Sequence, residues 1–165
     1  KKATSIVENM EKEFGIYFQK ISGKDGQRVV SKKITVEQFF SNRMLMVHAI
    51  RQGIPLSLFD SIQESAPFTD QDWSTFLDIS LKSLQRYRQD RKHVFKASHS
   101  EKILELTEVS AKGKAVFGSN EKFYAWLNDK NFALGNMKPA ELLRDSYGKE
   151  LVLSELNRID QGIFA

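Results

Sequence analysis

The sequence contains no cysteine, and only three of its 165 residues are proline. Without thiols the chain can form no disulfide, no thiolate metal site and no cysteine nucleophile. No apolar run approaches the roughly 18 residues of a membrane-spanning helix, and the first residues lack the charged-then-apolar pattern of a secretory signal. Because 41% of the residues are nevertheless hydrophobic, the chain can build a core. We expect a soluble, cytoplasmic protein of one compact domain or two small ones.

Signatures of catalysis and of cofactor binding are missing as well. The three histidines, His48, His93 and His99, are scattered and have no ligand partner at metal-binding spacing. No glycine-rich loop follows a strand pattern, as nucleotide binding would require, and no spacing of Ser, His and Asp singles out a catalytic triad. The sequence therefore predicts a protein that is not an enzyme and that holds no metal ion or cofactor.

Helical periodicity predominates and predicts a mainly α fold. A first helix is expected from Thr4 to Phe14, ended by Gly15. In the less regular residues 16–33, the apolar runs Ile16–Phe18 and Val29–Val30 flank a Gly-Lys-Asp-Gly segment. This composition is typical of a short β-hairpin, which we expect near the N-terminus.

Two capping boxes mark the starts of later helices. Thr35–Gln38 predicts a helix that runs to Arg51, and Ser98–Glu101 predicts the start of a long one. Helices are also expected after Pro55 and from Thr69 and Ser80. The C-terminal part is expected to contain helices at 101–117, 120–129, 139–144 and 148–161.

Residues 69–89 have the layout of a helix-turn-helix. Trp73, Phe76 and Leu77 share one face of a short helix, and a second helix begins three residues after Leu77, with Leu81 and Leu84 expected to face inward. The turn of this motif often places a glycine in the left-handed region. Asp78 stands there instead, and aspartate tolerates that conformation better than most residues.

The positive charge is concentrated in one stretch that overlaps this second helix. The net charge is +4, and residues 82–100 carry six basic side chains against one acidic side chain, whereas residues 1–81 are balanced and residues 101–165 carry one acidic residue in excess. A basic block of this kind is typical of a phosphate-binding surface. A solvated charged face of an ordinary helical hairpin is the alternative.

The second helix also carries the side chains that DNA recognition uses. Arginine and glutamine fit the base edges of guanine and adenine in the major groove, and a helix N-terminus favours a phosphate. Cations just beyond the helix suit the backbone contacts that set the register. We therefore predict DNA contacts from Ser80, Lys82, Ser83, Gln85, Arg86, Arg88, Gln89, Arg91, Lys92 and Lys96.

From Ile103 onward most apolar residues are expected to be the core and caps of small helices. Their order resembles the toxin-binding domain of the Xre/MbcA/ParS antitoxin family, and residues 54–100 resemble the Xre-like helix-turn-helix that precedes this domain in the family. At Asp160-Gln161 the sequence departs from the family, whose members often carry an aromatic residue or a histidine there. The matching motifs are Phe117-Gly118, Trp126-Leu127, Asn131 before Ala133-Leu134-Gly135, Pro139 before Leu142-Leu143, Gly148, Arg158-Ile159 and Gly162-Ile163-Phe164-Ala165.

The resemblance implies a bacterial antitoxin of a type II toxin–antitoxin system. Its partner would be a toxin encoded alongside, commonly of the RES-domain type that depletes cellular NAD, and the complex would repress its own operon. For the apolar chain end, the resemblance favours docking at the active cleft of the toxin, while folding back onto the helices is the alternative. The toxin contacts that the resemblance implies are Trp126, Asn131, Leu134, Arg158, Ile159, Ile163, Phe164 and Ala165.

These features divide the chain into a lead-in segment (1–53), a helix-turn-helix domain (54–100) and a toxin-binding domain (101–165). The lead-in segment is richer in apolar side chains than two small domains need, so we expect it to help hold a homodimer that reads two DNA half-sites. Two other functions remain open. One is a plain transcriptional regulator whose C-terminal domain only oligomerises or binds another protein, and the other is an adaptor that does not bind DNA.

Overall fold

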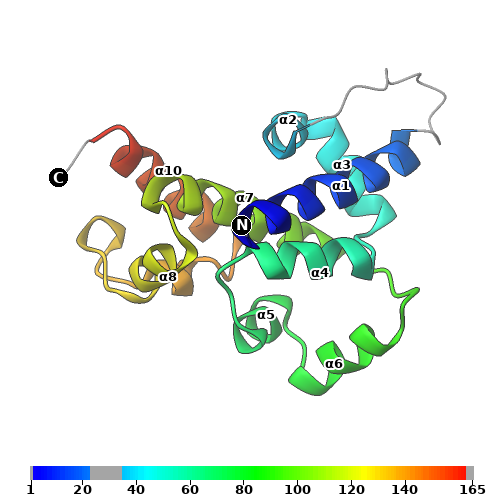
Figure 1. The fold of residues 1–165 in the computed structure, drawn as a ribbon. Coiled ribbons are helices and arrows are strands. Elements are labelled where there is room, and N and C mark those ends of the chain that lie inside the picture. The colour runs from blue at the N-terminus through cyan, green and yellow to red at the C-terminus, as the bar shows by residue number, and fades with distance from the viewer. Residues whose placement is uncertain (1, 23–34, 163–165) are drawn as a thin grey trace. The chain divides into compact units, whose positions relative to one another are not determined.

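The structure is a computed structural model that describes residues 2–22 and 35–162 (Figure 1). Within these residues it is helical, and its only β pairs are two isolated bridges. The predicted mainly α fold is confirmed, and no helix of the described residues is long and apolar enough to cross a membrane. The helices are α1 (Lys2–Ser22), α2 (Val36–Ser41), α3 (Arg43–Gln52), α4 (Leu56–Ser65), α5 (Asp70–Leu77), α6 (Leu81–Gln89), α7 (Ala97–Phe117), α8 (Asn120–Asn128), the 3-10 helix η1 (Phe132–Leu134), α9 (Pro139–Leu142) and α10 (Ser146–Asp160).

The described helices form two compact units, and neither unit is one continuous stretch of chain. Unit 1 takes Lys1–Ser65 and Lys82–Leu104, so it holds α1 to α4, nearly all of α6 and the first turns of α7. Unit 2 takes Ala66–Leu81 and Glu105–Ala165, so it holds α5, the rest of α7, α8, η1, α9 and α10. The two helices of the predicted helix-turn-helix therefore belong to different units.

In unit 1, α1 packs along α4 and does not end at Gly15. Phe14, Tyr17 and Phe18 are buried, and the Tyr17 hydroxyl donates hydrogen bonds to the carbonyl oxygens of Ala49 (3.0 Å) and Gly53 (2.8 Å). Burial raises the pKa of Tyr17 above its usual range, so the hydroxyl stays protonated as a donor. This burial outweighs the cost of about 1 kcal/mol for a glycine inside a helix.

The predicted β-hairpin is therefore wrong in the part that can be compared. Ile16–Phe18 lie inside α1 and not in a strand. The apolar periodicity of the helix continues through Gly15, because Phe14, Tyr17, Phe18 and Ile21 are all buried. Val29–Val30, the other half of the predicted hairpin, lies outside the described residues.

The helix predicted from Thr35 to Arg51 is split in two at Asn42. The predicted capping box is present: the Gln38 amide donates to Thr35 Oγ1 (3.2 Å), and the Thr35 amide donates to Gln38 Oε1 (3.1 Å). Asn42 then adopts an extended backbone, and its side chain accepts from the Leu45 amide (3.2 Å) to start α3. An asparagine side chain that bonds the backbone in this way competes with helix continuation.

A short backbone ladder joins the residues after α3 to the residues after α6, both in unit 1. The Leu56 amide donates to the His93 carbonyl (2.9 Å), and the Phe95 amide donates to the Ile54 carbonyl (2.9 Å). The Ser100 hydroxyl accepts from the Ile54 amide (2.9 Å) and donates to the Phe95 carbonyl (3.0 Å). We call residues 53–56 and 93–95 the backbone ladder.

The predicted capping box at Ser98–Glu101 does not form. Helix α7 begins at Ala97, so Ser98 lies inside the helix and cannot cap it. The Ser100 amide already donates to the Lys96 carbonyl (2.9 Å). This bond places Lys96, and not Ser98, at the position that precedes the helix.

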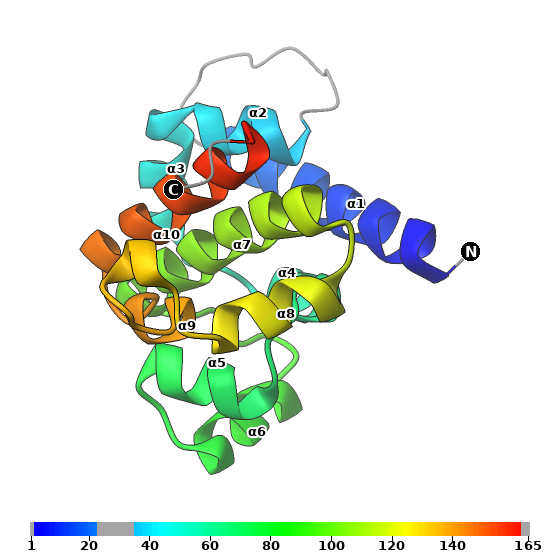
Figure 2. The same cartoon turned by 90° about the vertical axis from the view of Figure 1, so that its left-hand side faces the viewer.

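In unit 2, α10 lies along α7 (Figure 2) and is tied to it by polar contacts. The Ser146 hydroxyl donates to Glu105 Oε1 (2.6 Å), and Lys149 Nζ donates to Glu108 Oε2 (3.3 Å). The ring of Phe123 on α8 lies directly on Gly113 of α7, where a Cβ atom would overlap it. The apolar residues from Ile103 onward thus build a helical core, as expected.

Gly53 is the position where a side chain should be least tolerated in unit 1. Its backbone (φ 84°, ψ 150°) lies in a region that is essentially restricted to glycine, and a Cβ atom would stand 2.5 Å from the Phe95 carbonyl oxygen. We expect Gly53→Ala to lower the free energy of unfolding by about 3 kcal/mol or more. Gly118→Ala is the matched control, because Gly118 also has positive φ (78°) but open space around it. That control should cost only about 1 kcal/mol in urea denaturation; equal losses in both variants would contradict the role of the overlap.

Candidate nucleic-acid interface and partner-binding surface

Helix α5 forms as the sequence predicts, with a capping box at its start. The Thr69 amide donates to Asp72 Oδ2 (2.8 Å), and the Asp72 amide donates to Thr69 Oγ1 (3.2 Å). Trp73 and Leu77 are buried in unit 2, and Phe76 packs edge-on against Phe68 with ring centroids 5.2 Å apart. The apolar face predicted for the first helix of the motif is confirmed.

The turn after α5 has the conformation expected for Asp78. Its backbone is left-handed (φ 52°, ψ 48°), and its amide donates to the Thr75 carbonyl (3.3 Å). The Ser74 hydroxyl donates to the Ile79 carbonyl (2.7 Å), and the Ile79 amide donates back to the Ser74 carbonyl (3.1 Å). These bonds fix where the chain leaves α5, three residues before α6 begins.

Helix α6 buries one side chain fully and exposes a polar stripe. Leu84 is 1% exposed, whereas Leu81, which was expected to face inward, is 39% exposed. The stripe is formed by side chains at helical spacing, so they share a face. It consists of Lys82, Gln85, Arg86 and Gln89, all exposed. We call these four residues the α6 stripe. Ser83 beside them is half-buried, and Ser80 precedes the helix.

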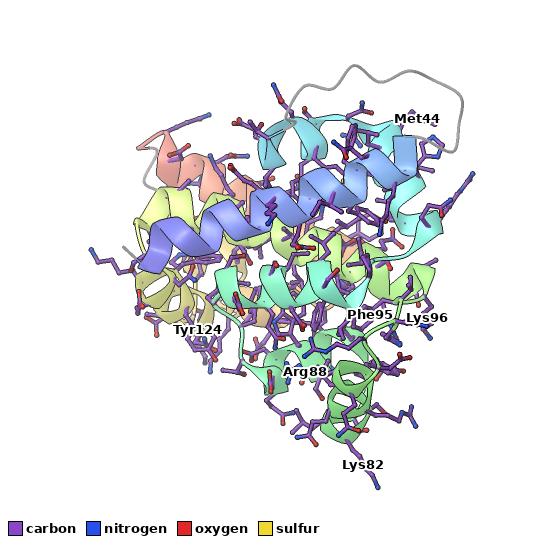
Figure 3. The ribbon with its side chains drawn as sticks, turned by 45° about the vertical axis from the view of Figure 1, so that its right-hand side comes forward. Met44, Lys82, Arg88, Phe95, Lys96 and Tyr124 are labelled. Carbon is purple, nitrogen blue, oxygen red and sulfur yellow. The ribbon has the colours of Figure 1, made fainter. Side chains whose placement is uncertain are left out.

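Arg88 points differently from the α6 stripe. Its guanidinium donates to Gln63 Oε1 on α4 (2.7 Å), and Figure 3 shows it directed toward α4 while Lys82 points away. Burial raises the pKa of the Asp60 carboxyl on α4, and the positive charges of Arg88 and Arg91 lower it. Arg88 therefore holds α6 to α4, and this bond competes with its predicted contact to DNA.

The remaining predicted DNA contacts lie after α6 and are accessible. Arg91, Lys92 and Lys96 are exposed. The Lys92 amide donates to Asp90 Oδ1 (3.0 Å), which holds the turn that carries this basic segment. The structure thus leaves three cations available for phosphate beyond the end of the α6 stripe.

His93 lies in an aromatic cluster with Tyr87 of α6 and Phe95. Its ring stacks on Tyr87 with centroids 4.0 Å apart, and it meets Phe95 edge-on at 4.7 Å. Among the described residues its Nε2 atom is buried and has no hydrogen-bond partner. Burial lowers the pKa of His93, and Arg86 lowers it further, against the opposite effect of Asp90.

The residues predicted to contact a toxin are spread over three elements of unit 2. Trp126 on α8 is half-buried and packs on Phe117 and Phe123. Asn131 and Leu134 belong to the η1 turn, where Leu134 is buried, and Arg158 and Ile159 are half-buried on α10. Arg158 is bonded to Glu155 (2.9 Å). The predicted contacts Ile163, Phe164 and Ala165 lie outside the described residues.

The end of α10 is held at its last residue. Asp160, at the position that departs from the family pattern, accepts from Lys112 Nζ on α7 (2.6 Å). Gly162 then has positive φ (69°), and its amide donates to the Ile159 carbonyl (3.0 Å), which closes the helix. The chain therefore leaves α10 at a fixed point.

Unit 2 also exposes apolar side chains that sequence reasoning missed. Phe132 and Tyr147 are each 89% exposed, and Leu151 and Met137 are 54% and 42% exposed. Tyr147 and Leu151, which we call the α10 pair, lie on the face of α10 opposite Val152 and Leu156. Their spacing in the sequence could have predicted that they are exposed. No signal in the sequence distinguished Phe132 from a core residue.

A contact between α8 and α5 was missed too. The Tyr124 hydroxyl donates to Asp72 Oδ2 (3.2 Å), within unit 2 and 52 residues away in sequence. Burial and the Asp72 carboxylate together raise the pKa of Tyr124, which keeps the hydroxyl protonated. In the part of the chain that the structure describes, no cluster of three metal-ligating side chains occurs.

Two family models match the chain. The model of the antitoxin Xre-like helix-turn-helix domain matches residues 45–108, and the model of the antitoxin Xre/MbcA/ParS C-terminal toxin-binding domain matches residues 112–162. A curated relative from Photorhabdus laumondii subsp. laumondii, named "Antitoxin Xre", is 27% identical over 115 residues, which cover 69% of this chain and 77% of the relative. The resemblance found in the sequence is confirmed.

His93 should make the stability of unit 1 sensitive to acid. Above its ordinary pKa of 6.5 the imidazole is neutral in both the folded and the unfolded chain, so its contribution is fully present. As the pH falls below 6.5, the unfolded chain takes up the proton first, and the contribution is lost through the lower folded pKa. We expect the urea concentration at the unfolding midpoint to decrease when the pH is lowered from about 7.5 to 5, and to decrease less in the variant His93→Phe. His48→Phe on α3 is the control, and an equal flattening in that variant would refute the assignment to His93.

Proposed function

We propose that this protein neutralises a toxin encoded beside it and represses the operon that encodes both, because residues 45–108 match an antitoxin Xre-like helix-turn-helix domain and residues 112–162 match the Xre/MbcA/ParS toxin-binding domain. The DNA-binding half of this function rests on one observation, the exposed α6 stripe with three exposed cations just beyond it. The toxin-binding half rests on the match of residues 112–162 to a toxin-binding domain.

DNA recognition divides between two groups of side chains. Gln85, Arg86 and Gln89 of the α6 stripe carry donors and acceptors for base edges in the major groove. Arg91, Lys92 and Lys96 contact phosphates and set the register. Lys82, Ser83 and Ser80, at the start of α6, bind a phosphate where the helix dipole favours an anion. Arg88 positions α6 through Gln63 in addition to any contact with DNA.

A homodimer is part of this proposal, because a helix-turn-helix commonly reads two half-sites as a two-fold assembly. The segment expected to hold the dimer is 1–53. Its described part supports this, because Met44 and Val47 on α3 are 62% and 36% exposed and Ile16 on α1 is 43% exposed. Apolar side chains of this size gain from being covered by a second copy.

The toxin is proposed to be of the RES-domain type, which depletes NAD. The antitoxin itself then needs no cofactor and no catalytic group, because the chemistry belongs to its partner. Gly162 turns the chain away from α10, and the residues after it are proposed to dock at the active cleft of the toxin. Trp126, Asn131, Leu134, Arg158 and Ile159 support or border this contact.

Two substitutions separate base reading from phosphate binding. Arg86→Ala should cost about 1–3 kcal/mol on operator DNA and relax the sequence preference. Lys92→Ala should weaken binding to all sequences about equally and reduce the slope of log K against log salt by about 1. Fluorescence anisotropy with operator and scrambled DNA at several salt concentrations measures both effects. If neither variant differs from the parent on either DNA, α6 is not the recognition helix.

Deletion of residues 162–165 tests toxin neutralisation. An aromatic anchor at the centre of an interface commonly costs about 2 kcal/mol or more on truncation, so co-expressing cells should lose protection from the toxin. The thermal midpoint and DNA binding should stay close to the parental values, since the deletion starts beyond the end of α10 and removes from it the bond of the Gly162 amide to the Ile159 carbonyl. Full protection by the truncated chain at matched expression would refute the proposal. Loss of the fold would show instead that the chain end caps the helices.

A further inference from the structure

The turn that connects α8 to α9 is held in one shape by its own backbone. The Asn131 amide donates to the Met137 carbonyl (3.0 Å), and the Asn136 amide donates to the Asn131 carbonyl (2.9 Å). Inside this bridge, the Leu134 amide donates to the Asn131 carbonyl (3.1 Å), and the Gly135 amide donates to the Phe132 carbonyl (3.1 Å). Leu134 anchors the turn because its side chain is buried.

This closed turn presents Phe132 to solvent. The ring is 89% exposed although both ends of the turn are tied together, and Met137 at the far side of the bridge is 42% exposed. Burying a phenylalanine or tyrosine side chain removes about 150–250 Å² from water, so leaving one outside forgoes a large gain. A fixed turn also loses little entropy on binding, which favours Phe132 as an anchor for a partner.

Helix α10 adds a second exposed apolar pair, and η1 packs against this helix. Tyr147 is 89% exposed and Leu151 is 54% exposed, one helical turn apart on the same face. The opposite face of α10 packs in the core of unit 2, because Val152 and Leu156 are fully buried. The α10 pair, Tyr147 and Leu151, therefore takes no part in the core of unit 2 and remains exposed.

We propose that Phe132 with Met137 and Tyr147 with Leu151 form an apolar docking surface for the toxin, separate from the chain end after Gly162. The proposal rests on the proposed toxin-binding function. All four residues lie within 112–162, the range that matches the toxin-binding domain. The exposed apolar residues suited to a contact between copies lie elsewhere, in unit 1 on α1 and α3. The occupant is therefore the toxin, with an apolar recess that accepts an aromatic ring.

The test measures binding of the full chain to the purified, catalytically inactivated toxin that is encoded beside it. Phe132→Ala and Tyr147→Ala should each raise the Kd about tenfold or more, because exposed aromatic anchors dominate interface energies. Phe132→Leu, which keeps an apolar side chain, should recover most of the affinity. Val94→Ala is the matched control, since it removes an exposed apolar side chain from unit 1, outside the proposed dimer contact, and should leave the Kd unchanged.

The variants are expected to fold, since surface substitutions of this kind commonly change stability by less than about 0.5 kcal/mol. Thermal melting and DNA binding therefore stay at the parental values. Parental toxin affinity in both alanine variants, while deletion of 162–165 still abolishes binding, overturns the docking surface and leaves the proposed function intact. Loss of self-association in the alanine variants, measured by light scattering, with unchanged toxin affinity would assign the surface to a second copy and also overturn the proposal. If the parent does not bind the toxin, the proposed function fails, and the docking surface fails with it.

Discussion

The placement of α6 depends on the backbone ladder between residues 53–56 and 93–95. Helix α6 has only nine residues and buries a single leucine fully, so its own hydrogen bonds would leave it marginal in water. The ladder closes the chain on both sides of α4 and α6 through the paired amides of Leu56 and Phe95. With its ends fixed, the segment can hold α6 through Leu84, through the bond from Arg88 to Gln63 and through the stack of Tyr87 on His93. The α6 stripe is then free to be wholly polar.

Local signals in the sequence predicted the parts of the fold that local chemistry decides. The capping box at Thr35 and the helix start at Thr69 form as expected, and Asp78 takes the left-handed conformation, because each needs only neighbours within a few residues. The same local logic failed where distant contacts decide. Gly15 does not end α1, since the burial of Phe14 and Tyr17 continues the helix. Ser98 does not cap α7, since the helix already begins at Ala97. At Asn42 the failure was local, because its capping capacity inside an apolar helix pattern was overlooked.

In the candidate site, too, features set by neighbouring residues could be predicted and features set by distant contacts could not. The shared face of the basic and amide side chains of α6 could be predicted, because it depends only on the charge and helical spacing of residues within one short segment. The inward orientation of Arg88 could not, since its partner Gln63 lies 25 residues away. The exposure of Phe132 could not be predicted either, because a phenylalanine in a small helical domain usually packs inside. Its exposure follows from the closed turn and from the burial of Leu134 beside it, and neither can be derived from the order of residues alone.

The hydrogen bond from Tyr124 to Asp72 has a consequence for how such proteins can be recombined. Asp72 belongs to the capping box of α5, inside the stretch that matches the helix-turn-helix family, while Tyr124 belongs to the stretch that matches the toxin-binding family. A crossover between residues 108 and 112 would follow the family boundary but would separate these two partners. Because α5 shares a compact unit with α8, a transplanted C-terminal half must bring a residue that fits the Asp72 carboxylate. Recombination at the family boundary is therefore constrained at α5, although α5 lies outside the stretch that matches the toxin-binding domain.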